Sequence, residues 1–216
     1  MITEEMIRRQ REFYSRPLPL GEKAAVRVLT PRNRHLGILT GTELPGRMML
    51  DIDPGGVFGD GAHESTRLCA AALERYVNPG DRLLDLGCGT GILSLLGLKL
   101  GAASALGVDI REEAVRLARH NARLNGLEGA FTARTGDLAR GITGRFDLIT
   151  ANLLPEPLLR LAPRLWDLLT PGGTAILGGI REGREGDIRA AAPSLELLEQ
   201  RAEGPWTALV LRKEKP

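Results

Sequence analysis

The residues of this chain that are best suited to chemistry are an acid and three glycines in an alternating pattern. Asp85 lies in an apolar run and is followed by Gly87, Gly89 and Gly91, after which the sequence turns apolar again. This pattern predicts a strand, a tight turn and a helix. Such a turn leaves backbone N–H groups uncovered at the start of the helix, so a small polar or anionic ligand can approach the main chain there. We therefore expect a cofactor-binding loop at residues 85–91, with a plain tight turn as the alternative.

The spacing of the glycines indicates which cofactor the loop binds. The dinucleotide fingerprint G-x-G-x-x-G/A needs a small residue three positions after its second glycine, and Ile92 occupies that position here. The sequence instead reads D-x-G-x-G-x-G. This version resembles motif I of the class I S-adenosylmethionine-dependent methyltransferases. The resemblance implies S-adenosyl-L-methionine as the cofactor, bound by residues of the loop: Asp85, Gly87, Cys88, Gly89 and Gly91.

A second acid follows the next apolar run. Asp109 ends the strand expected at residues 105–109 and is followed by Ile110. A carboxylate at the end of a parallel strand can accept both ribose hydroxyls of an adenosine cofactor, one with each oxygen. We expect Asp109 and Ile110 to contact the cofactor; the alternative for Asp109 is a cap for the helix that follows.

A third acid comes after the strand expected at residues 131–134. Asp137 and Leu138 stand where such a fold places the adenine ring. Asp137 can accept a hydrogen bond from the exocyclic amine, and the N–H of Leu138 can face a ring nitrogen. A plain turn acid is the alternative for Asp137.

A glycine-rich block, DPGGVFGDGAHEST at residues 53–66, leads into a helix expected to reach about residue 77. It resembles the D-P-G-x-x-F-G-T-G-x-H-x-T-T signature of the ribosomal protein L11 methyltransferase family, which also includes related protein-lysine methyltransferases. Asp60 departs from the signature, which has threonine there, and Ser65 departs likewise. The resemblance implies that the cofactor site includes Phe58, Gly59, His63 and Thr66, although His63 could instead stabilise the loop.

The stretch NLLPEPLLRLAP at residues 152–163 carries the remaining candidate. It resembles the N-[IL]-[LY]-x-x-P-L-x-x-L-x-P stretch of the same family. Asn152 offers an acceptor and a donor, which suits holding an amine with its lone pair aimed at the methyl carbon of a sulfonium. We expect Asn152 to be the catalytic residue and to contact the cofactor as well; a turn-shaping asparagine is the alternative.

The elements that must position these residues alternate between strand and helix after residue 80. The expected strands are 83–86, 105–109, 131–134, 146–151, 174–178, 195–201 and 206–212, and the expected helices are 92–100, 112–125, 156–169 and 182–191. This order predicts an α/β fold, a doubly wound, seven-stranded, mainly parallel sheet like that of the Rossmann-like class I methyltransferases, whose last two strands pair antiparallel. The ligand crevice of such a sheet lies outside the carboxyl ends of its strands, where the candidates fall. Trp206 is expected to be a core or edge aromatic.

The length of 216 residues suits one α/β domain, at residues 51–216, after a short N-terminal extension at residues 1–50. In the extension we expect a helix at residues 3–14 and extended pieces at residues 25–29 and 48–52. The arginines near its start favour a solvated helix face, with a nucleic-acid or acidic partner as the alternative.

The composition argues against several classes of protein. A net charge of +2 gives no global signal for nucleic-acid binding, and 43% apolar with 26% charged residues argues against global disorder. Cys69 and Cys88 have no CxxC spacing, and the three histidines are scattered, so we expect no metal site. The first residues are charged and include no apolar stretch typical of a leader, so we expect none, and no apolar run is long enough to span a bilayer. We expect a cytoplasmic protein with no membrane partner.

Methyl transfer from a sulfonium is a direct displacement that requires an aligned neutral nucleophile and the exclusion of water. The sequence therefore predicts an S-adenosylmethionine-dependent methyltransferase that modifies amino groups of a protein or peptide. Ribosomal proteins are among the candidate acceptors. The alternatives are a small-molecule N- or O-methyltransferase on the same scaffold and a non-enzymatic cofactor-binding interaction module. A nucleic-acid or glutamine acceptor is disfavoured, because the families that methylate those groups carry an N/D-P-P-Y/F exit with a stacking aromatic ring, and the residues after Asn152, LLP at 153–155, include no such ring.

The identity of the acceptor stays open at the level of the sequence. Members of the family that modify L11 carry a separate N-terminal recognition domain, whereas about 50 residues precede Asp53 here. The resemblance thus covers the catalytic part of the family without a full recognition domain.

Overall fold

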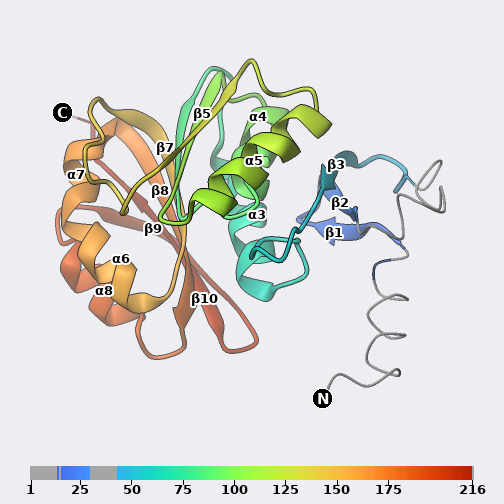
Figure 1. Cartoon of the computed structure of the whole chain (residues 1–216). Coiled ribbons are helices and arrows are strands. Elements are labelled where there is room, and N and C mark those ends of the chain that lie inside the picture. The colour runs from blue at the N-terminus through green and yellow to red at the C-terminus, as the bar shows by residue number, and fades with distance from the viewer. Residues whose placement is uncertain (1–13, 15, 30–42, 216) are drawn as a thin grey trace.

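The structure is a computed structural model, which describes residues 14, 16–29 and 43–215 (Figure 1). The helix expected at residues 3–14 lies outside the described residues except for its last position. The described chain forms a seven-stranded sheet flanked by helices and a separate three-stranded sheet near the N-terminus. None of its helices is long and apolar enough to cross a membrane.

The large sheet has the order β6-β5-β4-β7-β8-β10-β9. Its strands are β4 (Arg82–Leu86), β5 (Ser104–Asp109), β6 (Phe131–Thr135), β7 (Phe146–Asn152), β8 (Leu169–Arg181), β9 (Glu196–Glu203) and β10 (Trp206–Arg212). All neighbours pair in parallel except β10, which runs antiparallel to both β8 and β9. This is the α/β architecture predicted from the alternation of strands and helices.

Helices cover both faces of the large sheet (Figure 1). They are α3 (Glu64–Tyr76), α4 (Ile92–Lys99), α5 (Glu112–Leu124), α6 (Pro155–Leu161), the 3-10 turn η1 (Ala162–Arg164), α7 (Leu165–Leu168) and α8 (Glu185–Ala191). Successive residues of a strand point to opposite faces: Leu83 belongs to the core beneath α3, α4 and α5, and Leu84 to the core beneath α6, α7 and α8. The central strands are therefore buried on both sides, as parallel strands usually are.

Two elements differ from their predicted extents. The single helix expected at residues 156–169 is divided into α6, η1 and α7. Pro163 lies at the division, where it removes one backbone donor and its ring crowds the preceding turn. The strand expected at residues 174–178 is the longer β8. Its pairing with the last strand continues through the turn-like residues, since the N–H of Gly172 donates to Lys213 O at 2.8 Å and the N–H of Lys213 to Gly173 O at 2.9 Å.

The small sheet consists of β1 (Leu18–Leu20), β2 (Ala24–Val28) and β3 (Met48–Ile52), with β1 antiparallel and β3 parallel to β2. Strands β2 and β3 confirm the extended pieces predicted there. The buried carboxylate of Glu74, on α3, accepts from the N–H groups of Lys23 at 2.8 Å and Ala24 at 3.0 Å and so fixes this sheet to the helix layer. The division into residues 1–50 and 51–216 stays a prediction; its boundary falls within β3.

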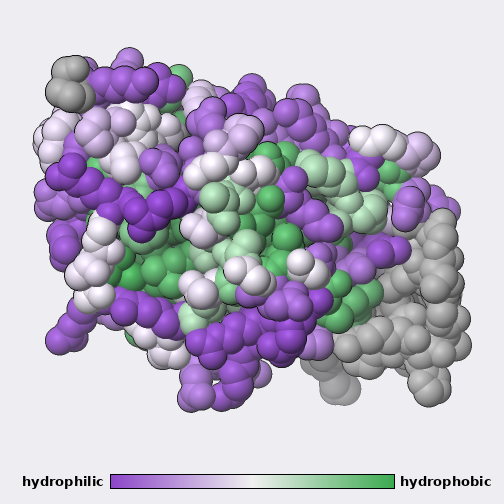
Figure 2. All heavy atoms as spheres, turned by 90° about the horizontal axis from the view of Figure 1, so that it is seen from above, coloured by the Kyte–Doolittle hydropathy of each residue, from purple (hydrophilic) through white to green (hydrophobic). Residues whose placement is uncertain are grey.

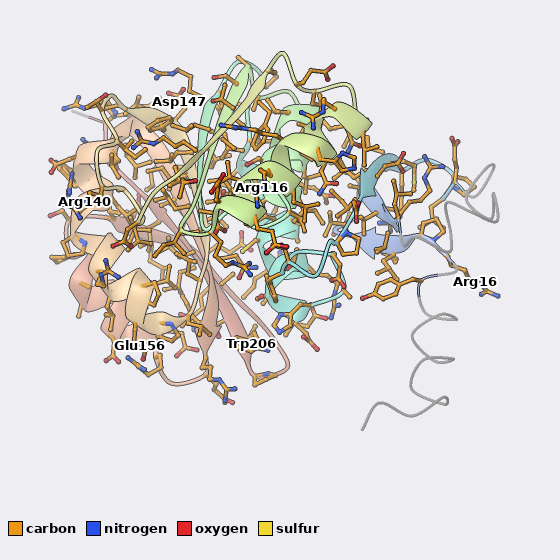
Figure 3. All side chains as sticks on the ribbon, viewed as in Figure 1. Arg16, Arg116, Arg140, Asp147, Glu156 and Trp206 are labelled. Atoms are coloured by element: carbon orange, nitrogen blue, oxygen red, sulfur yellow. The ribbon has the colours of Figure 1, made fainter. Side chains whose placement is uncertain are left out.

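The parallel strands end at one side of the molecule. In Figure 3, Asp147, near the start of β7, lies at the opposite end of the sheet from Glu156, which follows the end of β7. Trp206, at the start of the antiparallel β10, lies at the same end as Glu156. Figure 2 looks onto the other end, where apolar residues gather in the middle of a largely hydrophilic surface. The polar candidates from the sequence thus belong to the lower end in Figure 3.

Candidate functional site

A cavity of about 490 Å³ opens at the carboxyl ends of the parallel strands. This volume lies within the range of about 300–1,000 Å³ that is usual for small-molecule sites. The predicted residues that line it are Phe58, His63, Gly87, Gly89, Asp109, Ile110, Asp137, Leu138 and Asn152. The lining does not include five other predicted residues, which are Gly59, Thr66, Asp85, Cys88 and Gly91.

The glycine loop between β4 and α4 is shaped by positive φ angles, 76° at Gly87, 55° at Gly89 and 83° at Gly91. Glycine adopts these without the steric cost that a side chain adds. Gly89 also lies against the neighbouring segment, because a Cβ atom there would come 2.5 Å from the carbonyl oxygen of Phe58. The alternating glycines are therefore required by the path of the main chain.

The N–H groups of residues 87–91 in this loop all have partners within the protein. Those of Gly87 and Cys88 donate to Val108 O, at 2.7 and 3.0 Å, and that of Gly91 donates to Cys88 O at 2.7 Å. The remaining two, of Gly89 and Thr90, bond Asp109 and Phe58 O, respectively. The loop thus offers a ligand close approach to a surface without side chains rather than a row of free donors. This suits a cofactor that carries no phosphate.

Asp85 lies beneath the loop and is buried. Its Oδ2 accepts from the N–H of Ser94 at 3.2 Å and from the Ser94 hydroxyl at 2.7 Å, and its Oδ1 accepts from the Thr150 hydroxyl at 2.8 Å. Burial raises the pKa of Asp85, and these hydrogen bonds act in the opposite direction. The carboxylate joins β4, α4 and β7 from inside, so it supports the loop without lining the cavity.

Cys88 is buried within the loop and lies outside the cavity lining. Burial raises the pKa of its thiol well above the ordinary value. A thiol with a raised pKa is a poor nucleophile. Cys88 therefore fills space under the loop. Cys69, the other free cysteine, is also buried.

Asp109 ends β5 and reaches the cavity although it is only 8% exposed. Its Oδ2 accepts from the N–H of Gly89 at 3.0 Å, and its Oδ1 accepts from the N–H of Arg111 at 3.0 Å. Arg111 itself is the N-cap residue of α5, and its own side chain makes no capping hydrogen bond. Asp109 is therefore not the N-cap residue, although its carboxylate accepts from the N–H of that residue. Each carboxylate oxygen accepts more than one hydrogen bond, so both can also receive a ligand hydroxyl.

Asp137, Leu138 and Ile110 also line the cavity, and Ile110 is 69% exposed. Leu138 has a positive φ of 50°. Every other described residue with a positive φ is a glycine. A left-handed backbone conformation at a residue other than glycine raises the free energy of the folded state by roughly 1–3 kcal/mol. Such residues occur most often at functional sites. The Asp137 side chain is ion-paired with Arg160 of α6.

Asn152 is the last residue of β7 and lines the cavity. Its Nδ2 donates to the hydroxyl of Thr66 at 3.4 Å. A Cβ atom at Gly178, on the neighbouring strand, would come 3.1 Å from Oδ1, so the glycine leaves room for the amide. Thr66 is 1% exposed and does not line the cavity. The structure therefore places Thr66 behind Asn152 and away from the cavity.

The rings of Phe58, His63 and Trp206 form an aromatic wall of the cavity. The ring centroid of His63 lies 5.2 Å from that of Phe58 and 5.0 Å from that of Trp206, both edge to face. His63 also caps α3, since its Nδ1 accepts from the N–H of Ser65 at 3.2 Å. His63 therefore both lines the cavity and caps α3. The expectation for Trp206 was wrong: it lines the cavity, because β10 begins at the end of the sheet where the parallel strands end.

The segment that carries Phe58 is fixed to the glycine loop. The hydroxyl of Thr90 donates to Gly59 O at 2.6 Å, and the N–H of Thr90 donates to Phe58 O at 3.2 Å. Gly59, with a φ of 110°, leaves room for this hydroxyl, which a Cβ atom would approach to 2.7 Å. Gly59 therefore shapes the wall from outside the cavity.

Asp60, which departs from the family signature, has partners of its own. Its carboxylate accepts from the hydroxyl of Tyr14, and its Oδ1 accepts from the N–H of Ala62 at 3.0 Å. Burial and the neighbouring carboxylate raise the pKa of Tyr14. Asp60 thus connects the segment of the aromatic wall to the chain ahead of β1.

Several lining residues were missed from the sequence. They are Ser65, Val108, Arg111, Gly136, Leu153, Leu154, Pro157, Arg160, Gly179 and Trp206. Leu153 and Leu154 directly follow Asn152, so their position could have indicated them. Pro157 and Arg160 are three apart on α6, a spacing that puts both on one helix face. Gly179 carries no local signal, because only the sheet brings it to the cavity.

The residues present fit S-adenosylmethionine. The cavity combines a carboxylate with spare acceptor capacity, a glycine surface, a second carboxylate next to apolar side chains and an amide at a strand end. In the described part of the chain no group of three or more His, Cys, Asp or Glu side chains could hold a metal ion. The sheet order and this site define the class I methyltransferase fold. Comparison with known proteins then identifies the family: the chain belongs to the ribosomal protein L11 methyltransferase (PrmA) family, whose model matches residues 14–214.

Individual relatives agree with this assignment. The chain is 40% identical over 171 residues to the ribosomal protein L11 methyltransferase of Brevibacillus brevis, and the match covers 78% of this chain and 55% of that protein. It is 34% identical over 202 residues to the ribosomal protein L11 methyltransferase of Caldanaerobacter subterraneus subsp. tengcongensis, where the match covers 93% of this chain and 62% of that protein. The chain thus spans little more than half the length of these relatives. A crystal structure of a ribosomal protein L11 methylase from Lactobacillus delbrueckii subsp. bulgaricus matches with a TM-score of 0.79 at 28% identity, covering 93% of this chain and 99% of that one.

Proposed function

We propose that this protein transfers the methyl group of S-adenosylmethionine to amino groups of a protein or peptide. The observation that carries the proposal is that Asp109, at the end of β5, and Asn152, at the end of β7, line one cavity. The same cavity thus holds the Asp109 carboxylate, which can bind the ribose of the cofactor, and the Asn152 amide, which can bind the amine of the acceptor. Direct displacement needs this arrangement, since the nucleophile must reach the methyl carbon without leaving the site.

The cofactor residues are assigned as follows. Asp109 accepts the ribose hydroxyls, while Gly87 and Gly89 allow the cofactor to approach the main chain. Ile110, Asp137 and Leu138 hold the adenine. Phe58 and His63 close the cavity, and Gly59, Thr66, Asp85, Cys88 and Gly91 support the site from outside the lining. S-adenosylmethionine, when bound, supplies an electrophilic methyl group on its sulfonium.

Asn152 orients the acceptor. With its Nδ2 donating to Thr66, the amide presents Oδ1 as an acceptor for an N–H of the incoming amine. One hydrogen bond of this kind leaves the nitrogen lone pair free to point at the methyl carbon. We propose that the aromatic wall formed by Phe58, His63 and Trp206 limits the access of water to the bound groups.

The acceptor is proposed to be a ribosomal protein, with L11 as the first to test, because the family is described by that activity. A ribosomal acceptor is met in the cytoplasm, in agreement with the location predicted from the sequence. The chain spans 55% and 62% of the two relatives compared above, so the substrate has to be measured on this chain itself.

The test is to incubate the purified chain with methyl-labelled S-adenosylmethionine and either purified L11 or a cell lysate separated into protein, RNA and small-molecule fractions. We expect label in L11 and in the protein fraction, and labelling that is about a hundredfold slower or more with Asn152→Ala. Label confined to small molecules would replace this proposal with a small-molecule methyltransferase. Absence of label in every fraction would argue for a cofactor-binding module without activity.

A further inference from the structure

We propose that Arg160 is a positioning residue for the adenine of the cofactor. It holds one oxygen of the Asp137 carboxylate, so that the other oxygen is left to accept the exocyclic amine. The inference rests on the proposed function, because it takes adenine as the group at this end of the cavity. It adds a residue that determines which base the site accepts.

The contact itself is an ion pair between Nη2 of Arg160 and Oδ2 of Asp137. Within the part of the chain that the structure describes, the second oxygen, Oδ1, has no hydrogen-bond partner. Both side chains line the cofactor cavity, and both also line a neighbouring cavity of about 340 Å³ together with Arg140 and Arg164. The pair therefore forms part of the wall between the two cavities.

Helix α6 fixes where the guanidinium stands. Leu158 and Leu161 bury one side of the helix in the core, at 0% and 1% exposure, while Pro157 and Arg160 line the cavity. The helix begins at Pro155, only three residues after Asn152. The same short segment thus sets the amide at the acceptor end and the guanidinium at the adenine end.

The main chain around Asp137 is held independently of Arg160. The N–H of Gly136 donates to Asp109 O at 2.9 Å, and the N–H of Arg140 donates to Asp137 O at 3.1 Å. Leu138 keeps its left-handed backbone next to these bonds. Only the Asp137 side chain is left to rotate, and its side-chain exposure of 38% lets it turn toward water. Arg160 is the group that opposes this rotation, since ordering a side chain needs a compensating contact.

An oriented carboxylate distinguishes bases by their hydrogen-bonding groups. A carboxylate only accepts, so it pairs with the amine of adenine and repels the carbonyl oxygen of hypoxanthine. A carboxylate free to turn into water loses most of this difference. A guanidinium, with its planar set of donors, fixes the carboxylate plane better than an ammonium does. Arg160 should therefore act on base preference more than on overall affinity.

The experiment compares the binding of S-adenosylhomocysteine and S-inosylhomocysteine by titration calorimetry. For the wild-type chain we expect a preference for the adenine compound of about tenfold or more, the factor expected from one hydrogen bond to a charged group. Arg160→Met should reduce the preference to about threefold or less, and Arg160→Lys should fall between. Asp137→Asn should abolish or invert it. Arg164→Met is the matched control, because Arg164 lines only the neighbouring cavity.

A thermal melt of each variant shows whether it folds, which we expect because the Arg160 side chain is 62% exposed. Two results would overturn the inference in a chain that still binds S-adenosylhomocysteine. One is an unchanged preference for the adenine compound in Arg160→Met, and the other is a loss of this preference in Arg164→Met as large as that in Arg160→Met. Equal binding of both compounds by the wild-type chain would overturn it as well. Failure of the wild-type chain to bind either compound would overturn the proposed function together with this inference.

Discussion

The carboxylate of Asp109 accepts a hydrogen bond from the backbone N–H of Gly89 at 3.0 Å, across the space between two neighbouring strand ends. The residue proposed to hold the ribose thus also fixes the loop against which the cofactor lies. Since both groups face one cavity, a change at either should affect the other.

Replacing Asp109 should weaken the binding of the cofactor. Asp109→Ala removes the proposed acceptor of the ribose hydroxyls and frees the N–H of Gly89, so we expect at least about tenfold weaker binding of S-adenosylhomocysteine. Calorimetry measures the change. Glu112→Ala is the control, because Glu112 is exposed and pairs with Arg116 on the surface of α5. Unchanged affinity in Asp109→Ala would remove the ribose assignment.

Replacing Asn152 should slow methyl transfer more than it weakens cofactor binding. We expect Asn152→Ala to lower kcat by about a hundredfold or more, the scale typical of a lost positioning contact. The affinity for S-adenosylhomocysteine should change by less than about threefold. Single-turnover kinetics and calorimetry separate these effects. Equal turnover in the two proteins would contradict the role.

Thr66 should act through Asn152. Thr66→Val removes the hydroxyl that receives Nδ2 while keeping a similar shape, so it should lower kcat by less than Asn152→Ala does. In Asn152→Ala the same change should have little further effect, since the two mutations then share one mechanism. Additive losses in the double mutant would show that Thr66 acts separately.

Two glycines with positive φ allow steric contact to be separated from backbone strain. Gly89 and Gly126 have φ angles of 55° and 67°, but only at Gly89 would a Cβ atom meet another group, Phe58 O at 2.5 Å. Gly126→Ala should therefore cost about 1–2 kcal/mol of stability and leave cofactor affinity unchanged. Gly89→Ala should cost more and also weaken binding, because it displaces the segment of Phe58. Equal effects on both quantities would contradict the described packing.

The raised pKa of buried Asp85 predicts how stability depends on pH. Burial is its main cause, so the native state keeps the proton at a pH where the unfolded chain has lost it. This contribution to stability is present at low pH and is lost as the pH rises from about 3.8 through the raised value, with a slope of at most about 1.4 kcal/mol per pH unit. Denaturant unfolding of wild type and Asp85→Asn between about pH 4 and 7 should show that the stability of the wild type falls more steeply, or rises less, with pH than that of the variant, because only the wild type carries this group. Identical slopes would refute the assignment.

Much of the fold could be predicted because local patterns and tertiary structure agree. The strand before Gly87 and the helix after Gly91 have apolar runs that suit buried elements, and β4 and α4 begin and end close to the predicted positions. Pro163 and Gly172 were harder. Pro163 divides a helix that the apolar periodicity predicted to be continuous. Gly172 stays within β8 because it pairs with Lys213, about 40 residues later in the chain.

The membership of the cavity lining was predictable where a residue stands at a strand end, as for Asp109 and Asn152. It was not predictable where the role depends on hydrogen bonds made in three dimensions. Asp85 was expected at the cofactor, yet its three donors turn it into the core. Trp206 reaches the cavity only because an antiparallel strand starts at the edge where the parallel strands end.

The central claim is that the cavity at the carboxyl ends of the strands binds S-adenosylmethionine next to Asn152. Its most direct test is a calorimetric titration of the wild-type chain with S-adenosylmethionine, repeated with Asp109→Ala. We predict one binding site per chain, saturable in the wild type and weakened about tenfold or more in the variant. No binding by a folded wild-type chain, or equal binding by both proteins, would contradict the claim.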